Sequence, residues 1–210
     1  MRKASLLVLL CWVSQAWSDG ATDLFQKKLQ AIQTMQATFS QVIHANTREI
    51  SRSSGEMALA RPGRFRWQTL HPMPQLVLAD GTRLWVYDVD LEQVTVKKQA
   101  HGMDAGAGLF LSADEANWSK SFDVSLKQTG HHSEFDLRSK SGQTDFKRVT
   151  FQFEGDVLSG MELFDPLGQH TTVHFKHIKT NLVLPANVFQ FTPPKGVDVV
   201  DEGGARGSGH

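Results

Sequence analysis

Residues 61–67 read Arg-Pro-Gly-Arg-Phe-Arg-Trp and run from a turn into a strand. Their proline and glycine are typical of a tight turn. The residues that follow alternate, with Phe65 and Trp67 on one face and Arg64 and Arg66 on the other. One face of this strand is therefore apolar and aromatic, and the other is basic. The basic face is either a solvated surface or a match for an acidic partner.

Short alternating segments recur along most of the chain. The clearest one carries Val149, Phe151 and Phe153 on one face, and Asp80-Gly81 predicts a hairpin turn between two others. Adjacent hairpins with one apolar face predict a single curved antiparallel sheet. The segments expected to form strands are 37–43, 56–60, 64–70, 75–79, 83–87, 94–97, 122–126, 135–137, 149–153, 158–164 and 171–178.

One amphipathic helix precedes these strands. Thr22 is the expected N-cap of a helix over residues 23–32 that ends near residues 34–36. Its apolar stripe comprises Leu24, Phe25, Leu29 and Ile32. Residues 104–113 predict a short helix or flap, and residues 185–188 a single helical turn. The first helix and the flap are the available covers for the apolar face of the sheet, and a covered, curved sheet encloses a cavity.

The first residues have the layout of a secretory signal peptide. A basic head over residues 1–3 precedes an apolar run over residues 4–13, which is too short to span a bilayer as a helix. Ala16 and Ser18 then offer small residues at the cleavage positions, with Asp19 as the expected first mature residue. We expect three parts: a cleaved signal peptide over residues 1–18, one soluble domain over residues 19–200 and a flexible glycine-rich tail over residues 201–210.

Cysteine usage and charge exclude several classes of protein. The only cysteine, Cys11, lies in the expected signal peptide, so the mature chain has no disulfide, thiol nucleophile or cysteine-based metal site. Lipidation of Cys11 is disfavoured because the bulky Leu10 precedes it. The chain has 22 basic and 22 acidic residues, and removing residues 1–18 leaves 20 and 22. This balance does not suggest a nucleic-acid partner.

Catalytic and metal-binding patterns are also missing. The sequence contains no Gly-x-Ser-x-Gly, no His-Glu-x-x-His and no phosphate-binding glycine loop. The alternating acidic residues at 88, 90 and 92 are best explained by a turn. His170 and His174 would share a strand face about 13 Å apart, with His177 facing the other way, which is too wide for one ion. We therefore expect no enzyme activity, no cofactor and no metal.

A second stretch, residues 189–199, reads Phe-Gln-Phe-Thr-Pro-Pro-Lys-Gly-Val-Asp-Val. Together with residues 61–67 it resembles the LolA family, the periplasmic carriers of outer-membrane lipoproteins. Smaller matching pieces are Ala-Thr-Phe-Ser-Gln at 37–41, Ala-Asp-Gly at 79–81, and Leu-Trp-Val-Tyr at 84–87, which Gln93 follows. These pieces stand in the family's order and span nearly all of the expected mature chain.

The resemblance implies a mainly β fold, an incomplete β-barrel covered by a helical lid, with residues 103–112 as the candidate lid helix. It also implies a monomeric periplasmic chaperone. This chaperone would bind the acyl chains of lipoprotein cargo, receive the cargo from an inner-membrane ABC-type release complex and pass it to a LolB-like outer-membrane receptor. The expected mature chain starts with Asp19, whereas the receptor carries a lipid anchor on an N-terminal cysteine. We therefore do not expect this protein to be the receptor.

Site residues follow from the same resemblance. In the family, an arginine at the position of Arg61 latches the lid by hydrogen bonds, and the aromatic residue at the position of Phe65 handles cargo. Strand parity and bulk add Trp67, Leu78 and Trp85 to the expected cavity lining. The alternative function is a periplasmic lipid-binding or lipid-sensing module of the same fold, which would not need a latch. A lipid hydrolase would need a nucleophile and base that the sequence does not show.

Overall fold

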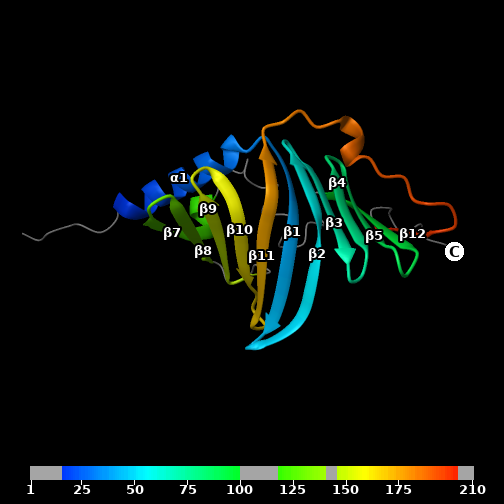
Figure 1. Cartoon of the computed structure of the whole chain (residues 1–210), viewed down its shortest axis with the longest axis horizontal. Helices are drawn as coiled ribbons and strands as arrows, with labels where there is room; N and C mark the ends of the chain where they lie inside the picture. The colour runs from blue at the N-terminus through cyan, green and yellow to red at the C-terminus, as the bar shows by residue number, and fades with distance from the viewer. Residues whose placement is uncertain (1–15, 100–117, 141–145, 203–210) are drawn as a thin grey trace, which may run out of the picture.

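A computed structural model describes residues 16–99, 118–140 and 146–202 of the chain (Figure 1). Twelve strands form one sheet in the order β12-β6-β5-β4-β3-β2-β1-β11-β10-β9-β8-β7. The strands are β1 (Thr34–Ala45), β2 (Arg48–Ala60), β3 (Arg64–His71), β4 (Gln75–Asp80), β5 (Arg83–Asp88), β6 (Gln93–Lys98), β7 (Phe122–Thr129), β8 (His132–Ser139), β9 (Arg148–Glu154), β10 (Val157–Phe164), β11 (Gln169–Thr180) and β12 (Asp198–Asp201).

The sheet is open and curved, with β7 and β12 at its two edges (Figure 1). All neighbouring strands are antiparallel except β12 and β6, which are parallel. The pairing of β1 with β11 joins the two hairpin series into one sheet. The predicted mainly β fold with a single curved sheet is therefore confirmed. The expected flap and lid helix over residues 103–113 lie outside the described residues.

The helix α1 (Ala16–Ala31) differs from the prediction at both ends. Thr22 is not an N-cap, because it lies inside the helix and is buried. The helix also ends before residues 34–36, since Thr34 pairs with Ala60 at the start of β1. A strand partner thus outweighs the local helical pattern. The predicted apolar stripe is confirmed at Phe25, Leu29 and Ile32, which are all buried.

Aromatic contacts fix α1 to one face of the sheet, which we call the inner face. The Phe25 ring lies 5.3 Å from the Phe135 ring and 5.0 Å from the Phe151 ring. Lys28 Nζ donates hydrogen bonds to the Gly155 carbonyl oxygen and Asp156 Oδ1, both at 2.7 Å. In Figure 1, α1 crosses the ends of the strands at the β7 side of the sheet. The helix therefore covers part of the inner face.

The C-terminal segment covers the opposite, outer face. The 3₁₀ helix η3 (Ala186–Phe189) confirms the predicted helical turn, and its Phe189 is buried against Ala58 and Ala60. The Phe191 ring then lies 5.8 Å from the Trp85 ring and 5.6 Å from the Tyr87 ring. The stretch at residues 189–199, which carried the family resemblance, therefore crosses the outer face and ends in the first two residues of β12, which pairs with β6.

Gly55 is required by close packing at a register shift between β2 and β3. A Cβ atom at this position would lie 1.9 Å from the Gln68 carbonyl oxygen and 3.0 Å from the Phe39 ring. We therefore expect Gly55→Ala to lower the free energy of unfolding by about 2 kcal/mol or more. Thermal unfolding of Gly20→Ala is the control, since a Cβ at Gly20 meets no atom within 4 Å. Equal melting temperatures for Gly55→Ala and the wild type would contradict this interpretation.

A further short helix, α3 (Trp118–Ser121), precedes β7. Among the helices of the described ranges, none is both long and apolar enough to cross a membrane.

Candidate functional site

Arg61 lies in the β2–β3 turn and holds the end of α1. Its side chain is buried, and Nε donates a hydrogen bond to the Ile32 carbonyl oxygen at 2.9 Å. Its backbone N–H donates to the Gln33 carbonyl oxygen, also at 2.9 Å. Ile32 and Gln33 directly follow the last residue of α1. A guanidinium is favourable there because the carbonyl groups at a helix C-terminus carry partial negative charge.

Asn181, just after β11, holds the same junction from the other side. Its Oδ1 accepts a hydrogen bond from the Gln33 backbone N–H at 2.8 Å, and its Nδ2 donates to the Ala31 carbonyl oxygen at 3.0 Å. Its backbone N–H donates to the Thr34 carbonyl oxygen. Asn181 has a φ of 59°, which asparagine tolerates better than most residues. Asn181 is not among the predicted site residues, because its only signal in the sequence is an asparagine at the end of an alternating strand.

Two further side chains brace the turns beside Arg61. Gln99 Nε2 donates to the Gly63 carbonyl oxygen at 2.7 Å, and Gln99 Oε1 accepts from the Gly81 backbone N–H at 3.0 Å. Asp80 Oδ1 accepts from the backbone N–H groups of Thr82 and Arg83, which confirms the predicted hairpin turn. The β2–β3 turn is thus tied to the β4–β5 turn.

Asp80 also ties this turn to β5, because its Oδ2 accepts a hydrogen bond from Trp85 Nε1 at 3.0 Å. Burial raises the pKa of Asp80, but the hydrogen bonds from Trp85 and the two backbone N–H groups outweigh it. The pKa of the carboxyl group is therefore held below its ordinary value. The ionised carboxylate is the form that these donors stabilise.

This lowered pKa predicts acid sensitivity. The unfolded chain takes up the proton first, so Asp80 stabilises the fold above about pH 4, and that contribution is lost as the pH falls through the folded-state pKa. We expect Asp80→Asn to be less stable than the wild type at pH 7 and the difference to shrink below about pH 4. Urea unfolding at a series of pH values measures this. A difference that stays constant with pH would contradict the assignment.

The inner face carries an aromatic cluster near the β2–β3 turn. The Trp67 ring stacks on the Phe39 ring at 3.8 Å with an interplanar angle of 23°. The Phe175 ring meets Trp67 edge-on at 6.3 Å, and the buried Phe65 ring lies 6.1 Å from it. Trp67 is only partly buried. The structure therefore brings Phe65 and Trp67 together on the inner face, which α1 partly covers.

Leu78 and Trp85 lie on the outer face instead. Leu78 pairs with Arg66 on one side and with Trp85 on the other, so these three side chains share a face. Leu78 is fully buried, and Trp85 packs beside Phe191. The four residues predicted to line one cavity are thus divided between two faces. The reason is the register of β3 and β4, which places Ala79 rather than Leu78 opposite Phe65.

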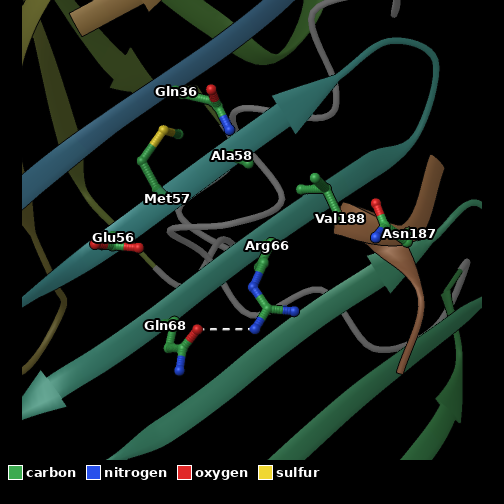
Figure 2. Close-up of a pocket in the computed structure, with 8 residues that line it drawn as sticks. All are labelled: Gln36, Glu56, Met57, Ala58, Arg66, Gln68, Asn187 and Val188. Carbon is green, nitrogen blue, oxygen red and sulfur yellow. Dashed lines mark hydrogen bonds between the residues drawn. The ribbon is translucent and has the colours of Figure 1, made fainter. Parts of the chain in front are cut away.

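A groove of about 370 Å³ lies on the outer face between η3 and strands β1 to β3 (Figure 2). In it, Arg66 Nη2 donates to Gln68 Oε1 at 2.8 Å. Burial lowers the pKa of Arg66, and the charge of Glu56 opposes this shift. The residues that line the groove are Gln36, Glu56, Met57, Ala58, Arg66, Gln68, Asn187 and Val188.

The predicted basic outer face is therefore not an open basic surface. The Arg64 guanidinium lies 5.4 Å from the centre of the Phe189 ring, so η3 partly covers it. Arg66 shares the groove with the carboxylate of Glu56. C-terminal residues that cross back over β3 account for this difference, and the alternation within β3 gives no sign of them.

Possible metal ligands are dispersed in the described part of the chain. No group of three histidine, cysteine or acidic residues there is arranged to hold an ion. His170 Nε2 lies 3.2 Å from Glu162 Oε2, and its ring stacks on Phe164. His177 Nδ1 lies 3.1 Å from Thr38 Oγ1. The acidic run at residues 88–92 forms the predicted turn, in which Asp88 Oδ1 accepts the Leu91 N–H.

These features define an open-sheet protein with an apolar inner face, a covering helix and a buried arginine at the end of that helix. The family model described as outer membrane lipoprotein carrier protein LolA matches residues 30–192. The chain belongs to this family, as its sequence resemblance predicted. Because the family consists of carriers, the expectation that the protein is not an enzyme is confirmed.

Two similar relatives are both named outer-membrane lipoprotein carrier protein. The one from Legionella pneumophila (strain Corby) is 52% identical over 96% of this chain and 100% of its own length. The one from Dechloromonas aromatica (strain RCB) is 41% identical over 87% of this chain and 88% of its own. An uncharacterised conserved protein from Thermus thermophilus has a similar structure, with a TM-score of 0.54, 14% identity and coverage of 88% and 98%. This last likeness concerns the fold alone.

Proposed function

We propose that this protein carries outer-membrane lipoproteins through the periplasm by binding their acyl chains against its inner face. An inner-membrane ABC-type complex supplies the cargo, and an outer-membrane receptor accepts it. The names of the relatives support the cargo class. The observation that carries the proposal is the aromatic cluster around Trp67 on the inner face, the face on which α1, whose end is bound by Arg61, packs at the β7 side.

The energetics of acyl chains explain why such a protein needs a closing device. Each buried methylene stabilises a complex by about 0.8 kcal/mol, so a chain of about twelve contributes on the order of 10 kcal/mol. A carrier must bury that surface and later release it. Hydrogen bonds of about 1 kcal/mol each, such as those from Arg61 to Ile32 and Gln33, are weak enough for cargo to displace. We propose that Arg61 is the latch of the closed state.

Phe65 and Trp67 are the residues proposed to contact the acyl chains. Leu78 and Trp85 support the sheet from the outer face and are not part of the proposed contact. The proposed cellular location is the periplasm, reached through the signal peptide expected at residues 1–18. The mature protein is proposed to act as a monomer whose carrier domain spans residues 19–200.

Fluorescence of Trp67 tests whether acyl chains reach the inner face. We expect a triacylated lipopeptide to change the tryptophan emission of the protein with saturation at one ligand per protein. The change should be largely lost in Trp67→Phe and kept in Trp85→Phe, whose indole lies on the outer face. An equal loss in both variants would contradict acyl binding at the inner face. Saturable binding of free phospholipid without binding of lipopeptide would favour the lipid-binding or lipid-sensing module.

A further inference from the structure

Two neighbouring turns at one end of the sheet form a distinct surface with β12. The Val89 backbone N–H donates to the Pro74 carbonyl oxygen at 3.2 Å, which joins the β5–β6 turn to the β3–β4 turn. The Asp198 N–H donates to the Glu92 carbonyl oxygen at 2.9 Å, which adds the start of β12. We call residues 70–76, 88–93 and 198–202 the acidic corner.

Exposed apolar side chains are concentrated in the acidic corner. Six of the eleven large hydrophobic side chains that are exposed in the described residues lie there, although the corner comprises only three short segments. Leu91 is 71% exposed and Met73 is 68% exposed. Single exposed apolar residues are ordinary, but a cluster marks an interaction surface. The six residues are Leu70, Met73, Val89, Leu91, Val199 and Val200, of which Val199 and Val200 follow one another on β12 and point to opposite faces of the sheet.

The charged residues within the acidic corner are all negative. Its segments contain six acidic residues and no lysine or arginine, in a chain that has 22 of each sign. Lys97 reaches the corner from β6, with its Nζ 3.4 Å from Glu202. Asp90 and Glu92 are exposed on either side of Leu91. Such a surface repels anionic lipid head groups and complements lysine and arginine side chains.

The acidic corner is remote from the proposed latch. Arg61 lies in the turn that precedes β3, and the corner begins at the other end of this eight-residue strand. At about 3.3 Å per residue, the six steps from Arg64 to Leu70 separate the β2–β3 turn from the two turns of the acidic corner by roughly 20 Å. A partner that binds the corner would therefore leave the end of α1 uncovered.

We propose that the acidic corner docks a protein surface that presents lysine and arginine side chains around an apolar patch. This inference rests on the proposed function, in which such a surface belongs to one of the two membrane-bound partners. Apolar contact with Met73 and Leu91 supplies affinity, and the acidic rim supplies orientation and a fast, salt-dependent association. The partner holds the carrier at the membrane while Arg61 releases the end of α1.

Two corner variants test the proposal, Asp90→Lys/Glu92→Lys and Met73→Ser/Leu91→Ser. Their matched controls are Asp123→Lys and Leu167→Ser, which change exposed residues elsewhere on the sheet. The release complex in nanodiscs and the soluble domain of the receptor are immobilised, and the Kd of each variant is measured at low and physiological ionic strength. We expect at least tenfold weaker binding of both corner variants to one partner. The charge variant should also lose most of its salt dependence, and the controls should stay within twofold of the wild type.

Binding of the corner variants to both partners at wild-type affinity would overturn the proposal. It would equally be overturned if the wild type bound neither partner, or if it bound phosphatidylglycerol vesicles through the corner residues. Uptake of triacylated lipopeptide is measured on the same samples. Normal uptake with unchanged partner binding refutes the docking surface alone, whereas loss of uptake in the wild type refutes the carrier function.

Discussion

Replacing Arg61 with leucine is expected to leave cargo uptake intact and to slow cargo delivery about tenfold or more. The side chain donates from Nε to the Ile32 carbonyl oxygen at the end of α1. In the proposed cycle this bond stabilises only the empty, closed state. Its loss shifts the equilibrium toward the loaded state by about 1–1.5 kcal/mol, and 1.4 kcal/mol corresponds to a factor of ten. Delivery of a labelled lipoprotein to receptor-containing membranes measures the rate.

Arg64→Leu is the matched control for this experiment. Arg64 lies three residues further on, across the same turn, but its guanidinium contacts the Phe189 ring on the outer face. Its loss should therefore leave delivery within about twofold of the wild-type rate. Equal delivery by Arg61→Leu and the wild type would show that Arg61 only stabilises the fold. Thermal unfolding of both variants separates this stabilising effect from the effect on delivery.

Phe25→Ala is expected to cause a large loss of stability. The Phe25 ring is completely buried and joins α1 to the aromatic rings of β8 and β9. Truncation of a buried phenylalanine costs about 3–5 kcal/mol, which for a domain of this size lowers the melting temperature by roughly 6–20 °C. Lipopeptide uptake should fall as well, because α1 would no longer be held over the inner face.

Lys27→Ala, which changes an exposed residue of the same helix, is the control for Phe25→Ala. Its melting temperature should stay within about 2 °C of the wild type, since exposed substitutions rarely change stability by more than about 0.5 kcal/mol. If both variants unfolded at the wild-type temperature, the packing of α1 on β8 and β9 would not be a major source of stability.

Local patterns predicted the strands well where one face is apolar. The alternation of Val149, Phe151 and Phe153 predicts β9, and all three side chains are buried in the sheet. The turn at Asp80-Gly81 was also predicted correctly, because its geometry depends on adjacent residues. The helical stripe around Leu29 predicted the buried face of α1. These features depend on neighbours in sequence, which explains why the sequence alone reveals them.

Features that depend on residues far away in the sequence could not be predicted from it. The end of α1 is set by the pairing of Thr34 with Ala60 and by the side chain of Asn181, which lies some 150 residues away in the sequence. The face of Leu78 is set by the register of β4 against β3, and the cover over Arg64 comes from η3. The alternation within one strand shows which of its own side chains share a face. It does not show which face the side chains of the next strand occupy, because the register across the connecting turn is unknown.

Release of a lipoprotein from the inner membrane tests the carrier function most directly. Spheroplasts that contain a newly made acylated lipoprotein would be incubated with the purified protein and ATP, and the supernatant would be analysed by size-exclusion chromatography. We predict a complex of one lipoprotein with one copy of this protein. Retention of the lipoprotein in the membrane, at protein concentrations that saturate binding of free lipopeptide, would contradict the carrier function.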